Sequence, residues 1–186
     1  MDDIIVTIIR KESIPTIMRG DLHTLRKVCS YASVVMLAGE VAFAVLTIAS
    51  VVLGAVSFTS PDVRDWFTHL IKCGTTDLSL AAGTIEMALL FAVMFLTVKT
   101  IHDTMVSIQK EHSPFMDSNA VRFKTLCIAY LVTSIPLSIL EFLNRGDQVL
   151  AICVLLAFIL ICVVLYCLTI IFRYGAMLQD ESDHTL

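Results

Sequence analysis

Four long apolar runs limit what this chain can fold into more than any other feature of its sequence. The last run, residues 148–172, is 25 residues long and carries no charged side chain. A helix of about 20 apolar residues is long enough to cross the hydrocarbon core of a bilayer. A backbone in lipid must satisfy its own hydrogen bonds, and the runs lack the polar–apolar alternation of a membrane barrel, so each run predicts a helix.

The runs predict membrane spans at about residues 32–58, 78–98, 125–143 and 148–172. Hydrophobic residues make up 57% of the 186-residue chain, whereas a soluble domain has about 45–50%. We therefore expect an all-α integral membrane protein with four transmembrane helices in a single domain, residues 1–186. Residues 144–147 are predicted to form a tight turn that makes the last two spans an antiparallel hairpin.

The basic residues fall unevenly on the two sides of the predicted spans. Ten of the 13 Lys and Arg residues lie before the first span, in the loop of about residues 99–124 or in the C-terminal tail. Because basic residues favour the cytoplasmic side, this bias predicts that both termini and the 99–124 loop are cytoplasmic. The net charge of −4 gives no reason to expect direct nucleic-acid binding.

The loop after the second span shows a helical pattern. Ile101, Met105 and Ile108 recur at helical spacing, so the second span is expected to continue beyond the membrane as an amphipathic helix. Ser113-Pro114 is then expected to break this helix. The 99–124 loop is therefore predicted to be more structured than the other loops.

Several residues have the side chains of helix N-caps. Asp21 is a candidate cap for the helix that leads into the first span, and the third span has three candidates at its start, Asp117, Ser118 and Asn119. Residues 4–9 form a short Ile-rich stretch that fits either a strand or a helix lying on a surface.

Pro136 and two aromatic residues allow further predictions about local structure. Pro136 is predicted to bend the third span, with Thr133 and Ser134 bonding the carbonyl groups that it frees. Trp66 and Phe67 lie in the predicted external loop between the first two spans, where aromatic side chains commonly anchor a protein at the membrane interface.

Two carboxylates, Glu40 and Glu86, lie inside the first and second spans. Their depths from the cytoplasmic side are close enough for both to line one cavity. One interpretation is a cation or proton site; the simpler alternative is a pair of glutamates that help helices to pack. Glu141, near the external end of the third span, is interpreted as an interfacial residue that reaches water or Arg145.

The remaining residues give no positive indication of enzyme chemistry. The motifs of serine hydrolases, zinc proteases and nucleotide-binding folds are absent, and neither a cofactor nor a metal is expected. His102-Asp103 is a weak metal motif without further ligands. The six cysteines have no CxxC spacing, which argues against a metal or redox site, and those inside apolar runs are interpreted as packing residues.

Two segments carry a resemblance to a known family. One is Glu111-His112-Ser113-Pro114-Phe115, followed by Asn119 and Arg122. The other is residues 172–186, Phe-Arg-Tyr-Gly-Ala-Met-Leu-Gln-Asp-Glu-Ser-Asp-His-Thr-Leu. With four spans, they resemble a bacterial membrane family known as "domain of unknown function 2975". The resemblance implies a multi-pass protein of the bacterial cell membrane with no assigned activity, frequently associated with small helix-turn-helix regulators. The N-terminal Ile-rich stretch has no match in the family pattern.

Two functional hypotheses follow. The first is a non-enzymatic protein that docks a small cytoplasmic helix-turn-helix regulator. The second is a small transporter or channel, oligomeric because four spans are few, with Glu40 and Glu86 as its intramembrane polar site. The candidate docking residues are Ser113, Pro114, Phe115, Gly175, Leu178, Gln179, Glu181, Thr185 and Leu186.

Overall fold

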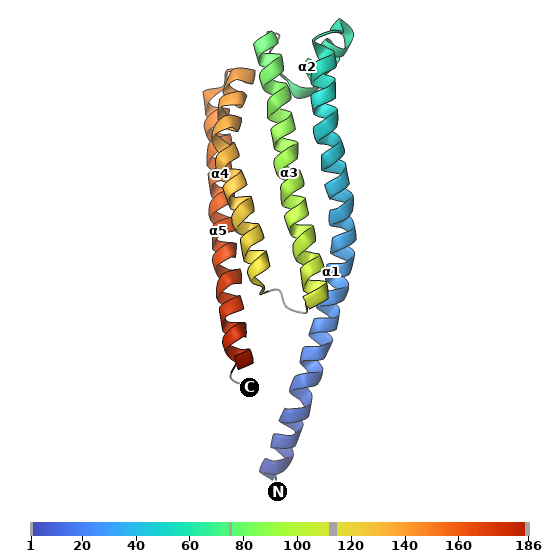
Figure 1. Ribbon diagram of the computed structural model, residues 1–186, viewed down its shortest axis with the longest axis vertical. Helices are drawn as coiled ribbons and strands as arrows, with labels where there is room; N and C mark the ends of the chain where they lie inside the picture. Colours follow the sequence, from blue (N-terminus) through green and yellow to red (C-terminus); the bar gives the residue numbers. More distant parts are fainter. Residues whose placement is uncertain (1, 75, 112–114, 185–186) are drawn as a thin grey trace.

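The computed structural model in Figure 1 is all-α. It describes the backbone of residues 2–74, 76–111 and 115–184, and the side chains of residues 27–74, 76–110 and 115–181. These residues form five helices, α1 (Asp2–Ser57), α2 (Pro61–Ile71), α3 (Asp77–Glu111), α4 (Asp117–Arg145) and α5 (Gln148–His184). Four segments are long and apolar enough to cross a membrane, Lys27–Ser57, Asp77–Lys110, Asp117–Arg145 and Gln148–Glu181. The predicted all-α class and the four spans are confirmed at this level.

The long helices pack in the order of the chain. Helix α1 packs on α3, α3 on α4, and α4 on α5, while the short helix α2 packs on α1. Figure 1 shows the start of α1, the end of α3, the start of α4 and the end of α5 toward the lower end of the molecule, and α2 and the α4–α5 turn at the upper end. We call these the terminal end and the α2 end. Because the long helices alternate in direction, residues that are distant in sequence lie side by side at each end.

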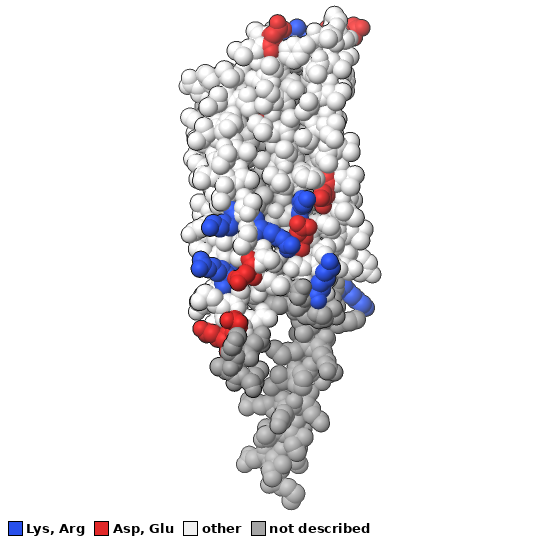
Figure 2. All heavy atoms as spheres, in the orientation of Figure 1, with Lys and Arg blue, Asp and Glu red and all other residues white. Residues whose placement is uncertain are grey.

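The outer surface of the helices is strongly apolar. Large side chains such as Ile48 on α1, Val132 on α4 and Leu160 on α5 are each more than 60% exposed. Figure 2 shows a wide belt without charged side chains, bounded by charges at the upper end and by a band of Lys, Arg, Asp and Glu in the lower half. An exposed apolar surface of this extent would promote aggregation in water, whereas lipid solvates it. The surface supports a multi-pass membrane protein.

Local signals set the helix ends at the α2 end. The Thr76 hydroxyl accepts a hydrogen bond from the Ser79 N–H (3.2 Å), which caps the start of α3. Gly146 ends α4 with φ of +72°, a left-handed conformation that glycine adopts without steric cost. The Asp147 carboxylate then accepts hydrogen bonds from Val149 N–H (2.9 Å) and Leu150 N–H (3.2 Å), starting α5. The predicted tight turn is confirmed.

The predicted N-caps are wrong. Helix α1 begins at Asp2, so residues 4–9 are helical and Asp21 lies in the helix interior, where the preceding turn supplies its backbone partners. The N-cap residue of α4 is Met116, without a side-chain cap bond. Asn119 is instead fully buried and accepts a hydrogen bond from Arg122 (3.0 Å), whose guanidinium also donates to the Asp103 carbonyl of α3 (3.1 Å).

Three other local expectations have mixed outcomes. Helix α3 continues to Glu111, which confirms that the helix extends past residue 98; the predicted break at 113–114 lies outside the described residues. The Thr133 and Ser134 hydroxyls donate to carbonyls of residues 129–131, rather than to the Val132 carbonyl that Pro136 leaves without an N–H partner. Trp66 is 56% exposed, but Phe67 is 2% exposed and packs against Leu80, because α2 turns that ring inward.

Candidate functional site

A buried polar cluster joins α3 to the end of α4. We use the name interhelical cluster for five residues, Ser79 and Glu86 of α3 and Glu141, Asn144 and Arg145 of α4. The Asn144 amide donates to Glu86 Oε2 (2.9 Å), and the Ser79 hydroxyl donates to the Asn144 carbonyl (2.5 Å). All except Arg145 are at most 7% exposed. The cluster is thus a set of direct polar contacts between two candidate spans.

The backbone around the interhelical cluster is closely packed. The Gly74 N–H, just before α3, donates to Ser79 Oγ (2.7 Å) and to the Asn144 carbonyl (3.3 Å). A Cβ on Gly83 would lie 3.1 Å from Asn144 Oδ1 and 2.9 Å from a methyl carbon of Ile71. Glycine at this position therefore lets α3 approach both α2 and the Asn144 amide.

The charges in the cluster do not cancel one for one. Arg145 Nη1 lies 3.1 Å from Glu141 Oε1, and Glu141 is only 2% exposed. The cluster thus has one guanidinium for two carboxyl groups. Glu141 is buried and reaches Arg145 rather than water, so its expected proximity to Arg145 is confirmed.

Glu40 and Glu86 do not share a cavity. Glu40 Oε2 lies 3.4 Å from His102 Nδ1, whereas Glu86 bonds to Asn144. His102 follows Glu86 by 16 residues on α3, which is about 24 Å along a helix axis. The expectation of one shared site is wrong, because Glu40 lies beside His102 in the half of α3 nearer the terminal end, whereas Glu86 lies in the half nearer the α2 end. His102 is a partner of Glu40 in the described structure.

A double-mutant cycle tests the Glu40–His102 contact. Both side chains are about one-fifth exposed, so we expect an interaction of about 0.5–1 kcal/mol when His102 is protonated, in the range of partly solvated ion pairs. Glu40→Gln, His102→Gln and the double variant would be compared by unfolding in mixed detergent micelles. Purely additive losses would show that the two side chains do not interact.

The two segments singled out by the family resemblance meet at the terminal end. A Cβ on Gly175 of α5 would overlap the ring of Phe115, so the ring packs directly against the α5 backbone. Phe115 also lies 6.1 Å from the Phe172 ring, which stacks on Phe123 of α4 at 5.1 Å. Three aromatic rings therefore connect the start of α4 to the last turns of α5.

A groove runs beside this aromatic contact. It has a volume of about 400 Å³ and is lined by Phe115, Met116, Asp117, Ala176, Met177, Gln179 and Asp180. Of the candidate docking residues, Phe115 and Gln179 line the groove and Gly175 supports it. Leu178 and Glu181 are exposed on α5. Ser113, Pro114, Thr185 and Leu186 lie outside the described residues.

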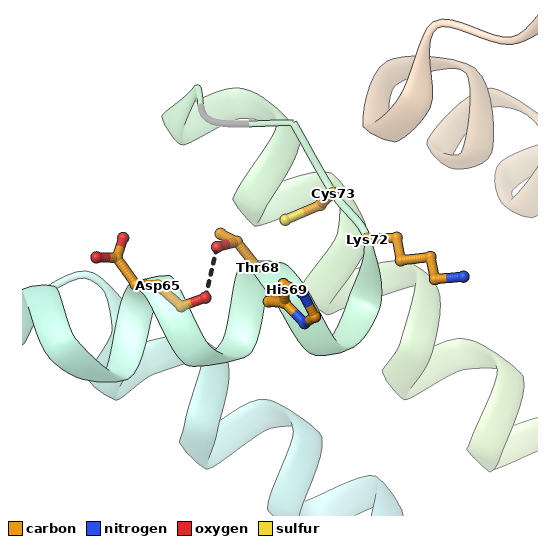
Figure 3. A pocket seen from close by; sticks show the side chains of 5 residues that line it. All are labelled: Asp65, Thr68, His69, Lys72 and Cys73. Carbon is orange, nitrogen blue, oxygen red and sulfur yellow. Dashed lines mark hydrogen bonds between the residues drawn. The ribbon is translucent and has the colours of Figure 1, made fainter.

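A shallower hollow at the α2 end is shown in Figure 3. Asp65, Thr68, His69, Lys72 and Cys73 line it. In this view the Asp65 and Lys72 side chains point away from each other, and the Thr68 hydroxyl donates to the Asp65 carbonyl (3.0 Å). Burial raises the pKa of the Cys73 thiol, which lowers its reactivity at neutral pH. The described side chains include no group of three or more His, Cys, Asp or Glu residues that could hold a metal.

Comparison with known proteins gives no further guide to the site. No protein-family model, curated protein or solved structure matches this chain significantly. Its sites must therefore be interpreted from their own geometry.

Proposed function

We propose that this chain is a membrane-embedded docking protein that holds a small, basic, cytoplasmic helix-turn-helix regulator at its terminal end. The observation that carries the proposal is the meeting of two segments, residues 115–117 and 175–180, around one groove. Phe115 belongs to one of the two segments that carry the family resemblance, and residues 175–180 belong to the other. The positive-inside bias of the basic residues supports a cytoplasmic position for this end.

The groove has the features of a surface that binds a short helix or loop. Phe115 is 40% exposed and Met177 is 55% exposed, so both present apolar area at the groove surface. Aromatic and methionine side chains are common anchors in protein interfaces. The Phe115 ring packs against Gly175 and contacts the Phe172 ring. These contacts hold the Phe115 ring in position without a bound partner.

The charge of the groove favours a basic partner. Among the described residues, its lining includes the carboxylates of Asp117 and Asp180 and no Lys or Arg, and Glu181 follows on the same helix. Proteins that bind DNA carry clustered Lys and Arg residues. Complementary charge raises the association rate and disfavours acidic competitors. A regulator held here would be kept from DNA if the same basic surface contacts the groove.

Reversing the groove charge tests the proposal. The tagged protein would be purified from gently solubilised membranes, and its partner would be expressed and bound to the purified wild type. Asp117→Lys/Asp180→Lys is expected to weaken binding at least tenfold, and added salt should weaken wild-type binding. The matched control is Asp62→Lys/Asp65→Lys, which reverses two exposed carboxylates at the α2 end.

Two results would overturn this proposal. One is a partner that binds the groove variant and the control variant equally well. The other is recovery of the chain alone, as a defined oligomer, with no small DNA-binding protein. Because the control changes the same number of charges, a general effect of net charge would appear in both variants.

A further inference from the structure

Two cysteines from neighbouring helices lie in contact between α4 and α5. The Sγ atoms of Cys127 and Cys162 are 2.8 Å apart. Each thiol also faces the other residue's backbone carbonyl, at 3.3 Å for Cys127 Sγ and 3.5 Å for Cys162 Sγ. Both cysteines are free thiols in the structure. The sequence expectation of separate packing residues missed this pairing, because a spacing rule detects only cysteines close together along the chain.

The surrounding packing holds the two thiols face to face. Cys127 is 8% exposed and belongs to an apolar cluster with Tyr130 and Leu165, and Cys162 packs against that cluster. The tight turn at Gly146 joins the two helices, which restricts sliding of one along the other. A disulfide has an S–S length of about 2.05 Å, so a small rotation of the side chains would bring the two sulfur atoms to bonding distance.

The Cys127–Cys162 pair differs from the other cysteines in its sulfur–sulfur contact, and small reagents can reach it. No other two cysteines among the described side chains are in hydrogen-bond contact with each other. Cys162 is partly exposed on α5, on a surface that lipid would cover. Cys127 lies one helical turn from Lys124, near the charged border of the apolar segment. A small reagent that enters lipid can therefore reach the pair.

We infer that Cys127 and Cys162 form a reversible dithiol–disulfide site that fastens α4 to α5. In the oxidation, two S–H bonds break and one S–S bond forms. The two electrons and two protons pass to a lipid-soluble acceptor of the azodicarboxamide or quinone class, which becomes the corresponding hydrazine or hydroquinone. A dithiol reductant restores both thiols by exchange through a mixed disulfide. Since the sulfur atoms already touch, oxidation ties the helices together with little change in their packing.

Counting free thiols in the full-length protein tests this inference. Membranes containing the protein would be treated with the azodicarboxamide diamide, denatured, alkylated with N-ethylmaleimide and analysed by mass spectrometry. The number of alkylated cysteines is expected to fall from six to four, to return to six after dithiothreitol, and to leave the protein monomeric on a non-reducing gel. The linked peptide should contain Cys127 and Cys162.

The choice of variants makes the result specific. In Cys162→Ala all five remaining cysteines should stay alkylated. Cys153→Ala removes an exposed cysteine from the same helix, and this variant should still lose two thiols. Full alkylation of the oxidised wild type, a linked peptide with other cysteines, or loss of two thiols in Cys162→Ala would each overturn the inference. Peptide mapping of the wild type decides the question even if a variant fails to insert into the membrane.

Discussion

Replacing Arg145 with methionine should lower the free energy of unfolding by about 3 kcal/mol. The substitution keeps an unbranched side chain but removes the cation that lies 3.1 Å from Glu141 Oε1. Glu141 is 2% exposed, so its carboxyl group would stay buried without its charge partner. We place the loss at the lower end of the range for broken buried pairs because Arg145 itself is 38% exposed. Unfolding in mixed detergent micelles, followed by circular dichroism, gives the measurement.

Arg64 provides a matched control for this prediction. Arg64 Nη2 lies 2.6 Å from Asp77 Oδ1, but Asp77 is 77% exposed, and solvated pairs contribute roughly 0–1 kcal/mol. Arg64→Met should therefore cost much less than Arg145→Met. Adding Glu141→Gln to Arg145→Met should recover more than half of the loss, because the neutral amide needs no cation. Equal losses at Arg64 and Arg145 would mean that the interhelical cluster does not stabilise the fold.

The membrane spans could be predicted because they depend on composition alone. Each run needs only enough consecutive apolar residues to cross a bilayer, and the turn at Gly146 needs only a residue that tolerates a positive φ. Neither inference requires knowledge of which helices touch. The described structure therefore agrees with the sequence on the number of spans and on the α4–α5 hairpin.

The contacts between helices could not be predicted in the same way. A helix in lipid is apolar on every side, so hydrophobic periodicity does not mark the face that packs against a neighbour. The sequence indicates the depths of Glu40 and Glu86 along their spans, but their partners depend on helix rotation and on the neighbouring helix. The packing of α1 and α4 on α3 is what brings His102 to Glu40 and Asn144 to Glu86.

Some missed features did leave a signal in the sequence. Pro61 stands at the first position of α2, followed by Asp62 in the first turn, a pattern typical of helix starts. Phe67 and Ile71 are four residues apart and both are buried, as expected for one face of a short helix. The predicted external loop could thus have been interpreted as a helix. Ser79 and Asn144 gave no comparable signal, since each is an ordinary residue near a helix end.

Enlarging Gly54 should disrupt the packing of α1 on α3. A Cβ at this position would lie 2.9 Å from Thr84 Cβ and 2.7 Å from Thr84 Oγ1. The Thr84 hydroxyl donates to the Leu80 carbonyl (2.8 Å), which opposes rotation of that side chain away from α1. Overpacking of this kind costs about 1–3 kcal/mol, and we expect Gly54→Leu to reach the upper end of this range in micelle unfolding.

Gly39 on the same helix offers the comparison that separates steric overlap from helix propensity. A Cβ there would lie 3.3 Å from Val98 Cγ1, at the end of a side chain that can shift slightly. Alanine is a better helix former than glycine by about 1 kcal/mol in water, so Gly39→Ala should be neutral or stabilising, whereas Gly54→Ala should destabilise. A stabilising Gly54→Ala would show that α1 and α3 do not approach closely at Thr84.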